Sequence, residues 1–176
     1  MSDRTHPPVS AAPEEFVRRL SALGDSERRA LRRAVGQPLG ADVLVYDIFC
    51  KVFRPVRRKE AMPKWACYLV ATLYPWHSAD GGHGNFGTAM RQLRPRTAPR
   101  ENRKRAAANR KRADQRFTRL LDCTGPVLSA ELTAAVRALR RNDVPVSWAQ
   151  LLDDLCRWYA PDRCTQSAWA ESYFKS

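Results

Sequence analysis

Few residues of this sequence have the type and spacing needed for catalysis. His77 and His83 flank a glycine-rich turn without a second histidine or a cysteine at metal-ligand spacing, so we interpret both as loop or partly exposed side chains. Asp153 and Asp154 are adjacent, and neighbouring helix positions diverge by about 100°, so they cannot converge on one metal ion. With Arg157 nearby, they predict ordinary surface ion pairs. No serine or cysteine has a nucleophile-elbow pattern. The sequence therefore predicts no catalytic residue, no metal and no cofactor.

Cationic side chains are abundant instead. The 176 residues include 31 Lys and Arg against 18 Asp and Glu, which gives a formal net charge of +13 and a pI near 10.2. Such a surface favours a polyanionic partner, above all nucleic acid. The charge is uneven: residues 91–119 contain 12 basic and two acidic side chains, net +10, whereas residues 1–90 have net +4 and residues 120–176 net −1. We therefore expect the middle of the chain to bind phosphate.

Much of this basic stretch, residues 94–113, has no apolar stripe that could pack against other helices. Pro95 and Pro99 exclude regular helix at its beginning, because each lacks an amide donor and disfavours the helical region for the preceding residue. After Glu101 the composition is mostly Arg, Lys, Ala and Asn, which could become helical once phosphates neutralise the charge. We predict a long basic loop near 94–113 that is mobile without nucleic acid.

Hydrophobic periodicity places further arginines on the helices that must flank this loop. A helix from about residue 26 turns Leu31 inward and three arginines outward, and a helix over 115–121 buries Phe117. A helix from Pro126 has a leucine and valine stripe opposite three more arginines. The predicted nucleic-acid-binding residues are Arg29, Arg32, Arg33, Arg91, Arg103, Lys104, Arg105, Arg110, Lys111, Arg112, Arg116, Arg119, Arg137, Arg140 and Arg141.

Other segments predict more helices. Residues 41–54 and 64–76 are the most apolar, and we expect each to be a helix central to the core. Ser147 and Gln150 form a capping-box pattern that starts a further helix, which carries Tyr159 inward. The patterns together predict an all-α protein, a single compact bundle of about seven to nine helices with a long basic loop.

This helical domain is expected to span residues 14–176, after a disordered tail over residues 1–13. The five cysteines are odd in number and widely spaced, and we predict small buried hydrophobes. Whether the C-terminal tryptophans belong to the core or to a subunit interface stays open at this point. No apolar run approaches the roughly 20 residues of a membrane helix, and no secretory signal pattern begins the chain, so we expect a cytoplasmic protein.

Five segments of the chain occur in a specific order and spacing. They are LRRA at 31–34, YLVATLY at 68–74, FGTAM at 86–90, RFTRLLD at 116–122 and VPVSWAQLL at 144–152. In this order they resemble the small-subunit family (CasB type) of the type I-E CRISPR Cascade complex. The likeness spans roughly residues 15–174 and lies in the order and spacing of the segments more than in any one of them.

The resemblance implies an all-helical, non-catalytic subunit that contacts nucleic-acid backbone and stabilises the R-loop in antiviral defence. The implied partners are CRISPR RNA, the target and non-target DNA strands, the other Cascade subunits and a second copy of the chain, with no membrane. By residue match, the family tends to place basic side chains at Arg32, Arg33, Arg116, Arg119 and Arg137.

One position departs from the family pattern, and two other functions stay open. Thr88 stands where the family often has a basic residue, and Arg91, one turn later, is the substitute that we expect.

A free-standing helix-turn-helix regulator would need a recognition helix with Asn, Gln or Arg aimed at bases. An RNA-processing nuclease would need cleavage that depends on His77 or His83 or that survives chelation.

Overall fold

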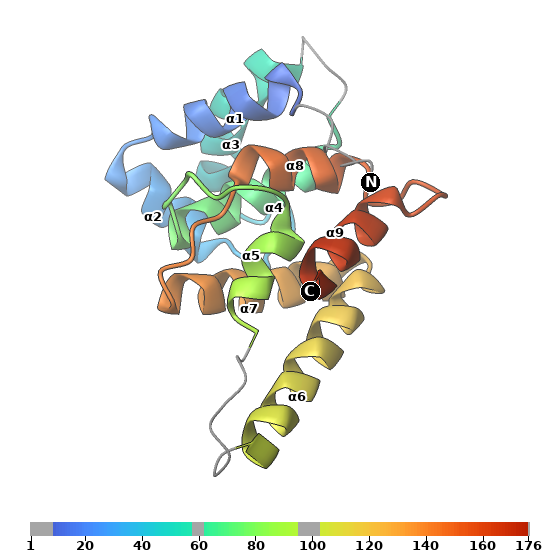
Figure 1. Ribbon diagram of the computed structural model, residues 1–176. Helices are drawn as coiled ribbons and strands as arrows, with labels where there is room; N and C mark the ends of the chain where they lie inside the picture. Colours follow the sequence, from blue (N-terminus) through green and yellow to red (C-terminus); the bar gives the residue numbers. More distant parts are fainter. Residues whose placement is uncertain (1–8, 58–61, 95–102, 176) are drawn as a thin grey trace.

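The computed structural model describes residues 9–57, 62–94 and 103–175. Within these ranges, nine α-helices and one 3₁₀ turn pack around one hydrophobic core, with no strand (Figure 1). The predicted all-α fold is confirmed. The elements are α1 (Ala11–Ser21), α2 (Asp25–Arg33), α3 (Val43–Arg57), α4 (Lys64–Leu73), η1 (Tyr74–Trp76), α5 (Phe86–Gln92), α6 (Arg103–Leu121), α7 (Gly125–Arg141), α8 (Trp148–Cys156) and α9 (Cys164–Phe174).

Helix α4 lies at the centre of the core. Every residue from Ala66 to Leu73 is buried, and the helix contacts α2, α3, α7 and α8. A helix that is apolar on all sides is stable only where other elements surround it. Helix α3 is buried along one face, which includes Ile48 and Phe49. The two most apolar segments therefore form the central helices, as the sequence predicts.

Three tryptophans of the C-terminal half belong to the core. Trp148, Trp158 and Trp169 are at most 2% exposed, and the indole N–H of each donates to a protein acceptor at 2.6–3.1 Å. A buried indole needs such a partner for its polar edge. The acceptors are the carbonyls of His77 and Cys123 and the carboxylate of Asp154. The structure thus assigns these tryptophans to the core.

Helix α6 corrects the prediction of a long basic loop. It begins at Arg103, so the second half of segment 94–113 is helical. Arg, Lys and Ala are strong helix formers, and burial of Phe117, Leu120 and Leu121 fixes the C-terminal half of the helix. Extending a helix that has already formed is far easier than nucleating a new one. Residues 95–102 lie outside the described residues, and the mobility of the basic segment stays a prediction.

Helix α8 begins at Trp148, as predicted, but without the predicted capping box. The Ser147 side chain makes no capping hydrogen bond, and Gln150 Nε2 donates to the buried carboxylate of Asp154 at 2.9 Å. A buried carboxylate without donors is more costly than an uncapped helix end, which water can solvate. The helix ends three residues before Tyr159, so Tyr159 leaves the buried face and is 54% exposed, contrary to expectation.

The beginning of the chain and two cysteines, the half-buried Cys156 and the exposed Cys164, also differ from expectation. Helix α1 begins at Ala11, inside the segment expected to be a disordered tail, while residues 1–8 lie outside the described residues. Cys50, Cys67 and Cys123 are buried as predicted, and burial raises the pKa of the Cys67 thiol. Cys164 is exposed at the beginning of α9. No helix in the described part of the chain is long and apolar enough to cross a bilayer.

Candidate nucleic-acid interface

Helix α2 presents arginines to solvent because its other face is buried. Ala30 and Leu31 pack into the core. At the start of the helix, the Glu27 carboxylate accepts the N-cap amide at 3.1 Å, which completes half of a capping box. Arg29 and Arg33 are exposed on the opposite side, as predicted. The short helix therefore offers cations at the surface without losing core contacts.

Arg32 differs from its neighbours because it stacks on Trp76. Its guanidinium carbon lies 4.2 Å from the ring centroid, and that of Arg137, from α7, lies 4.1 Å from the same centroid. The indole N–H of Trp76 donates to the Arg32 carbonyl at 3.2 Å. We call Arg32, Trp76 and Arg137 the Trp76 stack. The structure thereby joins two predicted binding residues that lie far apart in the sequence.

Trp76 is a candidate functional residue that sequence analysis missed. The sequence predicts one helix over 64–76, but α4 ends at Leu73, and Tyr74–Trp76 form the separate turn η1. Pro75 occupies the first turn of η1 and lacks the amide needed to continue the α-helix. Trp76 therefore leaves the buried face of α4 and is half-buried beside α2 and α7. The proline directly before the tryptophan was the available signal.

Helix α7 separates an apolar stripe from three arginines, as predicted. Its buried residues include Leu128, Leu132, Val136 and Leu139. Arg137, Arg140 and Arg141 are exposed. The last two lie in the final turn, where a cation also interacts favourably with the negative end of the helix dipole.

Residues 103–112, the first ten of α6, form what we call the α6 arm. All six cations of the arm are exposed, and it extends beyond the other helices (Figure 1). They are Arg103, Lys104, Arg105, Arg110, Lys111 and Arg112. Among the ion pairs formed by described residues, none involves one of these six. Within the described residues, Asp114 is the carboxylate that Arg110 senses, and it is already held by Arg94, so the cations of the arm stay available to a partner.

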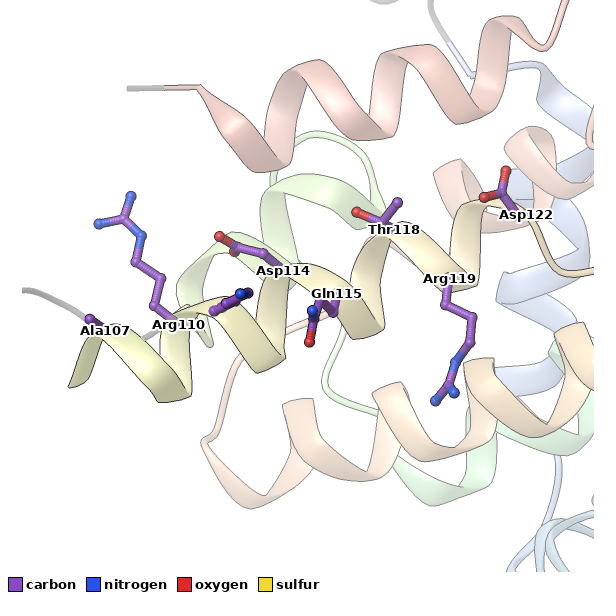
Figure 2. Close-up of a pocket in the computed structure, with 8 residues that line it drawn as sticks. Ala107, Arg110, Asp114, Gln115, Thr118, Arg119 and Asp122 are labelled. Atoms are coloured by element: carbon purple, nitrogen blue, oxygen red, sulfur yellow. The ribbon is translucent and has the colours of Figure 1, made fainter. Parts of the chain in front are cut away.

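The C-terminal half of α6 combines core packing with further cations. Phe117 is buried, and Arg116 is exposed on another side of the helix. In Figure 2, Arg119 extends toward α7, where its Nη2 lies 3.3 Å from a carboxylate oxygen of Glu131, whereas Arg110 points away. Two thirds of the Arg119 side chain stays exposed, so this ion pair is weak and can be exchanged for a phosphate.

An ion pair fixes the base of the arm. Arg94, which follows α5, donates from Nε and Nη2 to the two carboxylate oxygens of Asp114 at 2.8 and 2.9 Å, and Tyr173 donates its hydroxyl to Asp114 at 3.0 Å. The hydrogen bond from Arg94 lowers the pKa of Asp114, and burial raises the pKa of Tyr173. The Phe117 and Tyr173 rings stack with centroids 4.0 Å apart. α5, α6 and α9 are therefore linked where the arm joins the helical bundle.

Helix α5 crosses α9 at close range and carries another predicted residue. A Cβ on Gly87 would lie 2.1 Å from the Trp169 carbonyl oxygen, so only glycine allows this approach. Asn85 caps α5 by accepting the Thr88 amide at 3.1 Å, so Thr88, the position that departs from the family pattern, belongs to the cap. Arg91 is exposed and lies 3.5 Å from the first carbonyl after α9. Arg91 thus lies over the C-terminal end of α9.

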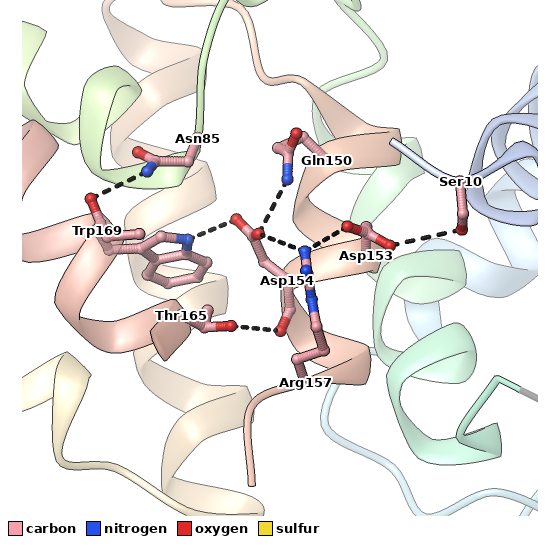
Figure 3. A network of polar contacts seen from close by, with 9 residues as sticks. Ser10, Asn85, Gln150, Asp153, Asp154, Arg157, Thr165 and Trp169 are labelled. Carbon is pink, nitrogen blue, oxygen red and sulfur yellow. Dashed lines mark hydrogen bonds and ion pairs between the residues drawn. The ribbon is translucent and has the colours of Figure 1, made fainter. Parts of the chain in front are cut away.

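Asp153 and Asp154 both pair with Arg157 as predicted, but Asp154 is buried and Asp153 half-buried, which corrects the prediction of a surface location. Asp154 is fully buried and accepts from Trp169 Nε1 at 2.6 Å, and Arg157 Nη2 lies 3.7 Å away. Arg157 also contacts Asp153, which accepts from Ser10 at 3.5 Å (Figure 3). The reason is tertiary, because α1 and α4 both contact α8. The network therefore links residues from both ends of the described chain and serves the fold.

The sequence also does not specify whether His77 and His83 are buried or exposed. His77 is 7% exposed, and its Nε2 donates to the Val144 carbonyl at 2.6 Å, which corrects the expectation of a loop or partly exposed side chain. His83 is exposed in the glycine-rich connection. Within 9–57, 62–94 and 103–175, no group of three His, Cys, Asp or Glu side chains could hold a metal ion. The chemistry that this surface offers is anion binding by guanidinium and ammonium groups.

Comparison with known proteins places this chain among CRISPR-associated proteins. The family described as CRISPR-associated protein Cse2 matches residues 27–174. The Cse2 protein of Thermus thermophilus is 30% identical over 150 residues, which cover 84% of this chain and 78% of the relative. The resemblance of the five segments is thus confirmed over most of the length.

Solved structures have the same fold. A Cse2-family protein from Thermus thermophilus superposes with a TM-score of 0.70 at 26% identity, covering 93% of this chain and 98% of that chain. M. ruber CasB gives 0.74 at 24% identity, over 95% and 94%. A chain of a CRISPR RNA-guided surveillance complex gives 0.67 at 24% identity, over 92% and 91%. With a family match over most of its residues and a relative at 30% identity, this chain belongs to the CRISPR-associated Cse2 family.

Proposed function

We propose that this chain is a non-catalytic subunit of a CRISPR RNA-guided surveillance complex, in which it binds nucleic-acid backbone and stabilises the R-loop. Its family and its likeness in fold to a chain of such a complex support this assignment. Its partners would be the guide RNA, the target and displaced DNA strands, the other subunits and a second copy of the chain. The observation that carries the proposal is the set of exposed cations on α2, α6 and α7, helices whose other faces are buried.

The mechanism follows from the energy balance of strand exchange. An RNA–DNA hybrid is about as stable as the DNA duplex that it replaces, so backbone contacts that form only in the opened state shift the equilibrium toward the R-loop. Each neutralised phosphate contributes about 0.7 to 0.9 to the slope of log affinity against log salt. Six to eight such contacts from these helices, an order-of-magnitude count, would make binding steeply dependent on salt.

Recognition by this surface would depend little on base sequence. The α6 arm contains no aromatic side chain on which a base could stack. Arginine and lysine at exposed helix positions contact phosphate oxygens, which position the nucleic acid without identifying its bases. A subunit of this kind would hold any target that the guide RNA has selected by base pairing.

Two double variants of the assembled complex test the proposal. Arg32→Ala/Arg33→Ala and Arg116→Ala/Arg119→Ala each remove two positive charges from the proposed surface. Each should shorten the R-loop lifetime by about tenfold, the size of one or two lost charge-assisted contacts. The matched control is Arg54→Ala/Arg57→Ala, which removes two exposed arginines from the end of α3, a helix outside the proposed set. Co-purification with guide RNA and partner subunits should be equal for all variants. An unchanged lifetime in both double variants would contradict the proposal.

A further inference from the structure

Two guanidinium groups stack on the Trp76 ring. The guanidinium carbons of Arg32 and Arg137 lie 4.2 and 4.1 Å from the ring centroid. Two cations this close to the centroid on one face would crowd and repel each other, whereas opposite faces separate them. The arginines therefore lie on opposite faces, and their central carbons are at most about 8 Å apart.

The ring itself is held in place by its own hydrogen bond and by its turn. The indole N–H donates to the Arg32 carbonyl at 3.2 Å, so a hydrogen bond to the backbone attaches the ring to α2. The ring belongs to η1, where Pro75 restricts the backbone, and η1 contacts both α2 and α7. Trp76 is thereby fixed relative to the two helices whose arginines it holds.

The two arginines keep their hydrogen-bonding edges available. Among the ion pairs of described residues, none involves Arg32 or Arg137. A stacked guanidinium still donates in its own plane, which is the geometry that binds phosphate through two parallel hydrogen bonds. On the Arg32 side of the stack lies an open hollow of about 340 Å³, lined by Arg28, Arg29, Arg32, Pro75 and Ser78, and by Asp25, which pairs with Arg28. A phosphate has room to approach here.

We propose that Trp76 is a positioning residue that holds Arg32 and Arg137 as a paired clamp for the sugar-phosphate backbone of one nucleic-acid strand. This proposal rests on the proposed function and assigns a specific geometry to part of that surface. Without the ring, two like charges within about 8 Å repel each other and their side chains regain rotamer freedom. With the ring, each cation is attracted to a π face, and the pair is ordered before a strand arrives. A base has no uncovered face of Trp76 on which to stack.

Substitutions at Trp76 test the clamp without changing any charge. Binding of the full chain to a fluorescein-labelled oligo(dT) strand of about 30 nucleotides can be measured by anisotropy over a range of salt concentrations. Trp76→Leu should weaken binding by about 5- to 10-fold, the size of two lost cation–π restraints. The salt slope should fall by about 1 to 2 because two phosphate contacts are lost. Trp76→Phe keeps an aromatic face and should recover most of the affinity.

A second variant keeps the ring and therefore does not depend on tolerance of the core to substitution at Trp76. Arg32→Lys/Arg137→Lys preserves the charge but replaces planar, stacking groups with ammonium groups, and it should weaken binding as much as Trp76→Leu. The matched control, Arg54→Lys/Arg57→Lys on α3, should bind like the wild type. Equal thermal melting of the variants would show that folding is not the cause.

The outcomes separate this proposal from the proposed function. If Arg32→Ala/Arg137→Ala weakens binding while Trp76→Leu and the lysine variant do not, the positioning role of Trp76 is wrong and backbone binding stands. If the alanine variant changes nothing, phosphate binding by this part of the surface is wrong as well. An abasic strand of equal length identifies the contact: the clamp requires the same loss on both strands. A loss restricted to oligo(dT) would mean that bases stack on Trp76 and would overturn the proposal.

Discussion

The α6 arm and the Trp76 stack hold cations in two different ways. The arm has six exposed cations within ten residues, and no ion pair of the described residues restrains them. The stack has two arginines from helices distant in sequence, each held within 4.2 Å of the centroid of one indole ring. The arm belongs to a projecting helix, whereas the stack lies where α2, η1 and α7 meet.

The comparison shows that charge density and positional order are separate properties of this surface. A free arginine or lysine side chain loses about 2 kcal/mol of rotamer entropy when a partner fixes it. In the arm that loss falls on the binding step, whereas in the stack the folded protein has already imposed it. We infer that the arm supplies long-range attraction and salt dependence, and that the stack supplies geometry.

Removing the charge of the arm should have the largest effect on binding. Glutamine at all six cationic positions of residues 103–112 keeps a good helix former at each place, so α6 should stay helical by circular dichroism. Affinity for a single strand at low salt should fall by about a hundredfold or more, and the salt slope by about 4, because up to six phosphate contacts are lost. A slope equal to that of the wild type would show that the arm does not contact phosphate.

Weakening the contact between α5 and α9, which supports the arm, should have the next largest effect, in this case on stability. The Cβ of Gly87→Ala would overlap the Trp169 carbonyl, so the free energy of unfolding should fall by about 1–3 kcal/mol in urea denaturation. Hydrogen exchange should accelerate in α5, α9 and the C-terminal half of α6 and stay slow around η1. Gly24→Ala is the control, because its new Cβ would meet Glu27 at an ordinary 3.8 Å. Uniform acceleration throughout the protein would mean that the two regions are not independent.

Neutralising Asp114 should have a smaller effect on the free energy of unfolding, and this effect should depend on pH. Arg94 holds the pKa of Asp114 below its usual value of 3.8, so the ion pair stabilises the fold fully above about pH 5 and loses this contribution as the pH falls through the lowered pKa. Asp114→Asn should therefore reduce the free energy of unfolding by about 1.5 kcal/mol at pH 7. The difference from the wild type should shrink below about pH 4. A difference that is constant down to pH 2 would contradict this account.

Exchanging arginine for lysine in the arm should have the smallest effect. Arg105→Lys/Arg112→Lys keeps the charge of two exposed side chains that no ring restrains, so affinity should change by less than about twofold. The same exchange in the Trp76 stack should weaken binding several-fold. Equal losses in the two regions, measured by anisotropy side by side, would remove the distinction between bulk charge and positioned charge.

Much of the fold could be predicted because its signals are local. The apolar stripe of α7, the buried segments of α3 and α4 and the start of α8 at Trp148 all follow from periodicity within one segment. The start of α6 at Arg103 could not, because the segment has no apolar stripe and its helix depends on the buried residues further along. The burial of Asp154 could not be predicted either, since nothing in α8 itself indicates that neighbouring helices cover that side.

The sequence by itself determined the all-α class, the concentration of charge in residues 91–119 and the outward direction of most predicted arginines. Only the tertiary structure decided what these arginines contact: Arg32 and Arg137 share Trp76, and Arg119 faces Glu131. It also pairs Arg94, which is outside the predicted set, with Asp114. The physical reason is that helical periodicity sets the direction of a side chain relative to its own helix axis. The distance between side chains on different helices depends on how those helices pack, which is fixed by contacts across the whole core.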